Sequence, residues 1–110
     1  MLAIRRIALA TVASLGLLLG GAALAKEVVI DVRTEQEFQA GHVPGALLIP
    51  YEQIGQKIAS ANVAKDDHIV LYCRSGRRSG IAQSTLKSLG FSNVDNYGSL
   101  EQARKRLQKP

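Results

Sequence analysis

Residues 68–80 read HIVLYCRSGRRSG, a continuous apolar run followed at once by a short basic loop. The run, residues 68–72, predicts a β-strand covered on both faces, as is typical of parallel sheets. The loop begins with Cys73, the only cysteine of the chain, and a helix is predicted from Ser79 to Leu89, before Gly90. A strand, a tight loop and a helix in this order predict an α/β fold.

The same alternation continues on both sides of this unit. Further strands are expected at residues 27–32, 46–49 and 94–97, and further helices at residues 35–40, 51–61 and 100–107. The order predicts a mainly parallel sheet with helices on both faces. Ligands of such sheets bind at the carboxyl ends of the strands, where Cys73 is expected to lie.

The helix boundaries have recognisable signals. Thr34 and Glu37 have the spacing of a capping box, and Gly41 is suited to end the helix that they begin. Ser99 is expected to cap the last helix, which runs to about Leu107. The helix after the basic loop should turn an apolar stripe inward, made of Ile81, Ala82, Thr85, Leu86 and Leu89.

Residues 1–25 have the pattern of a signal peptide. They contain Arg5 and Arg6, then an apolar run, and end in Ala23-Leu24-Ala25. The alternative is an uncleaved membrane anchor, but the run is shorter than the roughly 20 apolar residues that span a bilayer. We expect cleavage after Ala25, release into the periplasm and no stable membrane association thereafter.

The remaining 85 residues, 26–110, suffice for one small domain. They carry twelve basic and nine acidic residues, and no aromatic residue lies among the arginines of the loop to stack on a base. This balance argues against nucleic acid as a partner. We expect a monomer.

A single cysteine cannot form a disulfide within the chain. Cys73 is therefore a buried inert thiol, a site for pairing with another chain, or a nucleophile. The residues after it favour the nucleophile, because the backbone N–H groups of a loop that enters a helix can surround an anion. A helix N-terminus and nearby arginines also lower the pKa of a thiol from about 8.5. Three solvated surface arginines would not explain the cysteine among them.

Two segments resemble the signatures of the rhodanese family. They are DVRTEQEFQAGHVPGA, residues 31–46, and YCRSGRRS, residues 72–79. The resemblance implies a rhodanese-like three-layer α/β fold over residues 26–110 and a thiosulfate sulfurtransferase without cofactor or metal. Such an enzyme takes sulfur from thiosulfate or another small anionic donor, holds it as a persulfide on Cys73, and passes it to cyanide or a thiol.

The resemblance also implies roles for the loop residues. Cys73 matches the family's nucleophile and Arg78 the arginine that closes the loop, while Arg74 and Arg77 would add charge and specificity. Backbone N–H groups would bind the persulfide, and they belong to Ser75, Gly76, Arg77, Arg78 and Ser79. Cysteine phosphatases of related fold need an arginine one residue later, where this chain has Ser79.

Four other polar residues are expected to be structural. His42 lies in a predicted tight turn, and attack by a preformed thiolate needs no general base. Asp31 and Arg33 are interpreted as a polar brace at a strand end. His68 begins a strand, too far in sequence from His42 to suggest a metal site.

The chain departs from the family near its end. A usual pair of glycines after the last strand is Gly98-Ser99 here, and the chain has no tryptophan for the last helix. The packing of that helix therefore stays open. The alternative function is a non-catalytic sulfur carrier or partner-binding module, although family members of that kind typically lack the cysteine or the basic loop, and both are present here.

Overall fold

The computed structural model describes residues 24–108. The predicted signal peptide lies outside this part except for its last two residues, so its boundary stays a prediction. Within residues 24–108, no helix combines the length and the apolar composition needed to cross a membrane.

Strands and helices alternate, as the sequence predicts. In chain order the elements are β1 (Glu27–Asp31), α2 (Glu35–Ala40), β2 (Leu47–Leu48), the 3-10 helix η1 (Tyr51–Gln53), α3 (Ile54–Lys57), the 3-10 helix η2 (Ile58–Ala61), β3 (His68–Cys73), α4 (Arg77–Ser88), β4 (Val94–Ser99) and α5 (Leu100–Leu107). The strands form one sheet in the order β2-β1-β3-β4, and every pairing is parallel.

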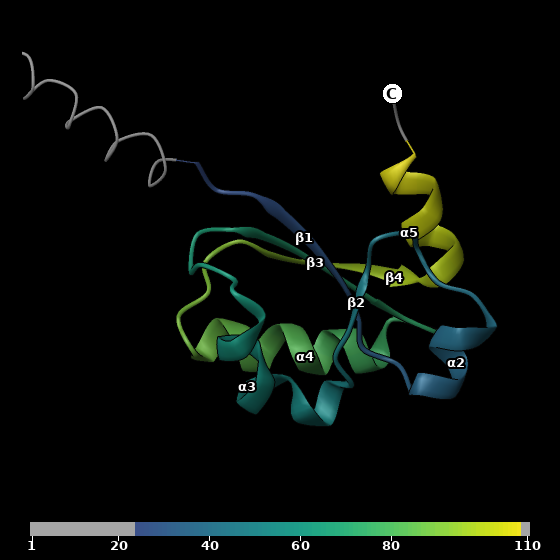
Figure 1. Cartoon of the computed structure of the whole chain (residues 1–110), viewed down its shortest axis with the longest axis horizontal. Helices are drawn as coiled ribbons and strands as arrows, with labels where there is room; N and C mark the ends of the chain where they lie inside the picture. The colour runs from purple at the N-terminus through teal and green to yellow at the C-terminus, as the bar shows by residue number, and fades with distance from the viewer. Residues whose placement is uncertain (1–23, 109–110) are drawn as a thin grey trace, which may run out of the picture.

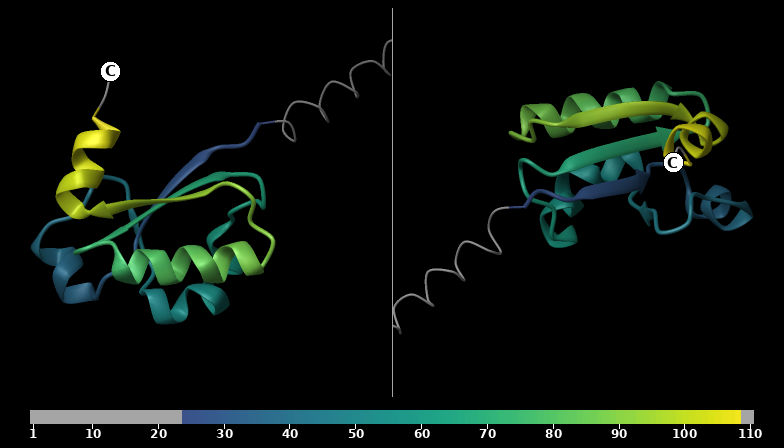
Figure 2. Two further views of the ribbon diagram at one scale, coloured as in Figure 1. Left: turned by 180° about the vertical axis from the view of Figure 1, so that it is seen from behind. Right: turned by 90° about the horizontal axis from the view of Figure 1, so that it is seen from above.

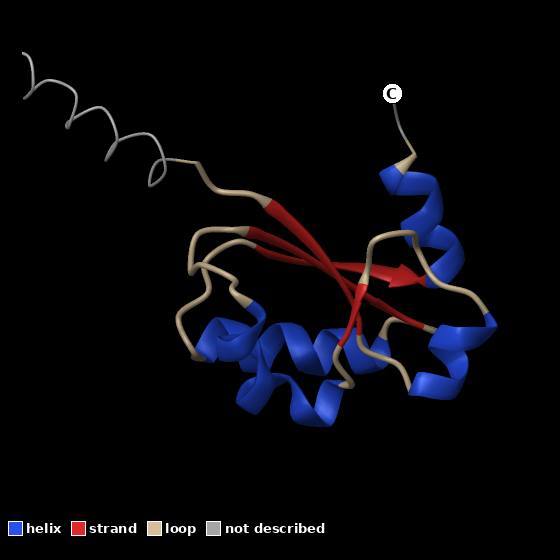
Figure 3. Ribbon diagram, in the orientation of Figure 1, coloured by secondary structure: helices blue, strands red, loops and turns tan. Residues whose placement is uncertain are grey.

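The sheet is the middle one of three layers. Helices α3 and α4 lie on one face and α5 lies on the other, while α2 lies beyond the carboxyl ends of the strands (Figures 1 and 2). With strands and helices coloured separately, the sheet passes between the two helical layers (Figure 3). The predicted fold class is thus confirmed.

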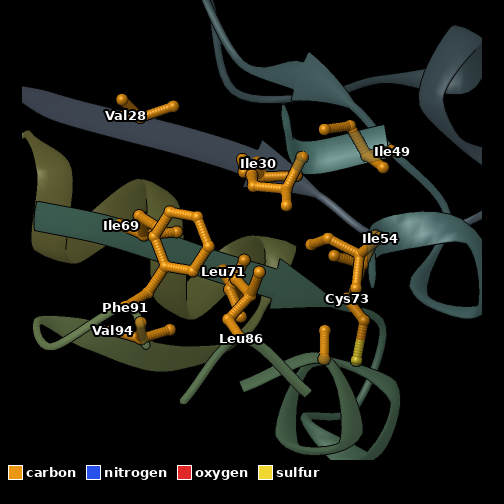
Figure 4. Close-up of a cluster of buried hydrophobic side chains, with 13 residues drawn as sticks. Val28, Ile30, Ile49, Ile54, Ile69, Leu71, Cys73, Leu86, Phe91 and Val94 are labelled. Carbon is orange, nitrogen blue, oxygen red and sulfur yellow. The ribbon is translucent and has the colours of Figure 1, made fainter. Parts of the chain in front are cut away.

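The buried side chains of the strands alternate between the two faces, because successive residues of a strand point to opposite sides. Ile30 and Leu71 pack toward α3 and α4 with the larger core cluster, which also contains Cys73 (Figure 4). Tyr72 points the other way and packs with Ala103 of α5.

Two details of the helix predictions are wrong. Ile81 and Leu89 are 41% and 43% exposed, because the sheet covers only a narrow stripe of α4 that contains Ala82 and Leu86. The helix expected at residues 51–61 is broken into η1, α3 and η2, whose starts have no side-chain cap.

The ends of α2 and α5 agree with their sequence signals. Thr34 and Glu37 form the capping box of α2, and Gly41 follows its end. Ser99 caps α5, with Gln102 as the other half of the box. Helix α5 has no tryptophan and packs on the sheet through a small residue instead. This residue is Ala103, near the middle of the helix, which is fully buried.

Candidate active site

Cys73 is the last residue of β3 and lies at the carboxyl edge of the sheet, as expected. Its side chain is 0% exposed and lies at the end of the larger core cluster, next to the start of α4 (Figure 4). The β3–β4 register is irregular between Leu71 and Cys73, and Cys73 pairs with Ser99. Such irregularities re-aim side chains at the ends of strands.

The loop after Cys73 turns back over the sulfur. Gly76 precedes α4 with a φ of 98°, in the left-handed region that favours glycine. Its N–H donates to Cys73 Sγ at 3.0 Å, and the Ser79 hydroxyl lies 3.4 Å from the same atom. The sulfur is therefore buried, but polar donors surround it on the side of the loop.

These donors determine the acidity of the thiol. Burial raises the pKa of Cys73, but hydrogen bonds from the hydroxyl and N–H of Ser79 and from the N–H groups of Gly76 and Ser75 outweigh it and lower the pKa to about 7. The sequence prediction of an activated thiol agrees with this value. These hydrogen bonds, rather than the charges of the arginines, are the main cause of the lowered pKa of Cys73.

Arg78 lies on the first turn of α4 and binds Glu37 of α2. Its two terminal nitrogens donate to the two carboxylate oxygens at 2.9 and 3.1 Å. The hydrogen bonds from Arg78 and Thr34 lower the pKa of Glu37 to about 2. The ion pair ties α2 to the loop, a link that sequence reasoning missed because it gave Glu37 only a capping role.

Arg74 and Arg77 are both exposed, and among residues 24–108 neither lies within ion-pairing distance of a carboxylate. Arg74 borders a surface hollow of about 350 Å³ between α2 and the start of α5. The other residues that line this hollow are Arg33, Glu37, Ala40, Ser99, Leu100 and Glu101.

Asn96 of β4 is a second residue that the sequence analysis did not single out. Its Nδ2 donates to the Gly76 carbonyl at 2.9 Å. Its Oδ1 accepts from the Ser79 hydroxyl at 2.7 Å and from the Gly98 N–H at 2.9 Å. The only available signal was a polar residue near the carboxyl end of a strand next to the cysteine's strand.

Asp31 and Arg33 form the expected polar brace. The Arg33 side chain donates to both carboxylate oxygens of Asp31, at distances from 2.6 to 3.1 Å, and to the Gly41 carbonyl at 2.7 Å. Both residues are buried. The brace joins the end of β1 to the turn after α2 and makes no hydrogen bond to the sulfur.

The two histidines lie away from the thiol. His42 stacks on Phe38 and bonds to its carbonyl at 2.8 Å, in agreement with a structural role. His68 lies at the amino end of β3, between Glu27 and Asp95. Within residues 24–108, no group of three histidine, cysteine or acidic side chains could hold a metal ion.

Known proteins share both the sequence pattern and the fold. A family model described as "Rhodanese-like domain" matches residues 14–105. Thiosulfate sulfurtransferase PspE of Escherichia coli is 40% identical over 77 residues, which cover 70% of this chain and 74% of that protein. A putative sulfur carrier protein of Bacillus subtilis, YrkF, is 37% identical over 62% of this chain but only 36% of its own length. A solved structure named "rhodanese with anions from E. coli" superimposes with a TM-score of 0.67 and 39% identity, over 69% of this chain and 89% of that one.

Proposed function

The chain belongs to the rhodanese family, and we propose that it is a thiosulfate sulfurtransferase that works through a persulfide on Cys73. The observation that carries the proposal is the environment of this sulfur. It is the only thiol of the chain, it accepts from the Gly76 N–H at 3.0 Å, and its pKa is about 7. Much more of it is thus the reactive thiolate at neutral pH than of an ordinary thiol.

In the first step, the Cys73 thiolate attacks the outer sulfur of thiosulfate. A new S–S bond forms at Cys73 while the S–S bond of thiosulfate breaks, and sulfite leaves with the bonding electron pair. The products are a persulfide anion and sulfite, so the three negative charges of the reactants are conserved. No proton and no external oxidant or reductant is needed.

In the second step, an acceptor attacks the outer sulfur of the persulfide. Cyanide takes it as thiocyanate and a thiolate takes it as a new persulfide, and either reaction returns Cys73 as a thiolate. The donor, the leaving group and the intermediate are all anions. A loop of N–H donors that enters a helix, with basic side chains around it, suits every one of these species.

We propose the following roles for the residues of the loop. Cys73 is the nucleophile, and Arg78 holds the loop closed through its pair with Glu37. Arg74 and Arg77, which are exposed and free of carboxylate partners among residues 24–108, attract the donor. The N–H groups that bind the persulfide are those of Ser75, Gly76, Arg77, Arg78 and Ser79.

The mature enzyme in this proposal is residues 26–110, a monomer released into the periplasm after removal of residues 1–25. N-terminal sequencing of the exported protein tests it. We expect Lys26 as the first residue, and recovery of Met1 in a membrane fraction would show that the segment is an anchor.

The second candidate function is a sulfur carrier, which the similarity to YrkF supports. Both functions predict that thiosulfate adds one sulfur atom to the intact protein, that cyanide removes it, and that Cys73→Ser never acquires it. The two functions predict different amounts of thiocyanate when thiosulfate and cyanide are both in excess. The enzyme forms thiocyanate many times per molecule, whereas a carrier that needs a partner to unload forms little more than one equivalent. A sulfur atom on Cys73→Ser would overturn both.

A further inference from the structure

The two groups that donate to the Cys73 sulfur share a third partner. Gly76 gives its N–H and Ser79 its hydroxyl to Sγ, and both residues also bond to the side chain of Asn96. Asn96 is half-buried on β4, the strand next to the one that ends in Cys73. One side chain thus connects a strand of the sheet to both donors.

The orientation of the Asn96 amide is determined by two backbone groups. The Gly98 N–H at 2.9 Å needs an acceptor, and the Gly76 carbonyl at 2.9 Å needs a donor. The oxygen of the amide therefore faces Gly98 and its nitrogen faces Gly76. Any hydrogen bond between the Ser79 hydroxyl and that oxygen, which are 2.7 Å apart, therefore has Ser79 as the donor.

The Ser79 hydroxyl has one proton but three acceptors nearby: Asn96 Oδ1 at 2.7 Å, the Gly76 carbonyl at 3.2 Å and Cys73 Sγ at 3.4 Å. Beside a neutral thiol, the shortest of these bonds holds the proton. Beside a thiolate or persulfide, the charge-assisted bond to sulfur is the stronger one. When the hydroxyl turns to the sulfur, Asn96 Oδ1 still accepts a hydrogen bond from the Gly98 N–H.

We propose that Asn96 is a positioning residue for the Cys73 thiolate, because its bond to the Gly76 carbonyl holds the loop from which Gly76 and Ser79 donate to the sulfur, and this bond does not depend on where the Ser79 proton points. Asn96 does not touch the reacting atoms. Asn96 Oδ1 competes with the thiolate for the Ser79 proton, and this competition disfavours the thiolate by no more than the free energy of one neutral hydrogen bond. The loss of Asn96, in contrast, loosens two donors to a charged sulfur, each of which is worth more. We therefore expect the loss of Asn96 to destabilise the thiolate.

The test is the pH dependence of alkylation of Cys73 by iodoacetamide, which reports the thiolate without any need for turnover. With one cysteine in the chain, no other thiol interferes. Asn96→Ala should raise the midpoint by about one pH unit, and Ser79→Ala by about one to two, the size of one hydrogen bond to a charged group. The double variant should rise by less than the sum, because Asn96 acts partly through Ser79.

The variants leave the titratable groups on the surrounding elements in place. Those groups are Arg78 of α4, Glu37 of α2, Tyr51 of η1, the Asp31–Arg33 pair at the end of β1, and Arg74 and Arg77 of the loop. Asn93→Ala, an exposed asparagine just before β4, is the matched control and should keep the wild-type midpoint. If Asn96→Ala does not fold, Asn96→Leu decides. Leucine is similar in size and carries no charge, but it loses the donor to Gly76, so the midpoint should also rise.

A midpoint that is unchanged or lowered in the folded Asn96 variant would overturn the proposal, and so would strict additivity with Ser79→Ala. The catalytic consequence alone rests on the proposed function. If that function holds, kcat below pH 7 should fall with the thiolate fraction and recover at high pH. A raised alkylation midpoint in a protein that never forms thiocyanate would refute the sulfurtransferase and leave the role of Asn96 intact.

Discussion

Replacing Arg78 by alanine tests whether the closed loop is needed for the reaction. The substitution removes both hydrogen bonds to Glu37, at 2.9 and 3.1 Å. Glu37 keeps its bonds to the N–H and hydroxyl of Thr34, so the cap of α2 survives. The link between α2 and the loop is lost.

The cost in stability follows from the exposure of the pair. Hydrogen bonds to charged groups contribute about 1.5–3 kcal/mol when buried. Here the side chains of Arg78 and Glu37 are 20% and 26% exposed, so water replaces part of what is lost. We expect a loss of about 1–2 kcal/mol, which lowers the Tm of a domain of this size by roughly 5–15 °C. At 25 °C the variant should still be folded.

The cost in rate is larger. If Arg78 keeps the N–H groups in place around the sulfur, kcat for thiocyanate formation should fall on the order of 10²-fold, as for the loss of one preorganised donor. Arg78→Lys keeps the charge but not the planar fork, so it should recover only part of the activity. Glu37→Gln leaves Arg78 charged but weakens its anchor, and kcat should also fall.

Steady-state kinetics with thiosulfate and cyanide, together with thermal melts of each variant, provide the measurement. A folded Arg78→Ala protein with wild-type kcat would refute the reasoning. It would mean that the ion pair supports only the fold.

Three further predictions concern other parts of the domain. Arg74→Ala and Arg77→Ala should raise KM for thiosulfate with little change in kcat, and added salt should raise KM more in the wild type than in either variant; equal salt dependence would contradict their role in attraction. Because the pKa of Glu37 is about 2 in the folded chain against 4.5 ordinarily, its contribution to stability is complete above pH 4.5 and is lost as the pH falls toward 2. Urea denaturation at pH 7 and pH 3 should show this loss, and it should be smaller in Glu37→Gln. On α4, Leu86→Ala should cost about 2–5 kcal/mol because Leu86 is fully buried, whereas Ile81→Ala, at an exposed site, should change the free energy of unfolding by less than about 1 kcal/mol.

The order of the elements could be predicted because the local signals agree with the global fold. The apolar run at residues 68–72, the capping box at Thr34 and the cap at Ser99 each determine their segment through short-range physics. Those signals place Cys73 at the edge of the sheet without knowledge of any tertiary contact. The exposure of Ile81 and Leu89 could not be predicted in this way, since the periodicity of a helix does not show how wide a face its neighbours cover.

The partners of the loop could not be predicted for a similar reason. Glu37 and Arg78 are 41 residues apart, and Ser79 and Asn96 are 17 residues apart. Such pairs depend on how elements meet in space, and a local pattern already explains each residue in another way. Glu37 fits a capping box, and Asn96 fits an ordinary strand end. The sequence therefore indicated which residue reacts but not which residues hold it.

The complete burial of Cys73 has a consequence for the regiochemistry of sulfur transfer. A persulfide has two sulfur atoms that a thiol can attack, and attack at the inner one would give a mixed disulfide between the acceptor and the protein. In this chain the inner sulfur would be Sγ, which is enclosed by the core and by the loop. The added sulfur would lie about 2 Å from Sγ, at the free end of the new S–S bond. An acceptor therefore meets the outer atom first, so the same burial that protects the thiol directs each encounter toward transfer and away from a dead-end disulfide.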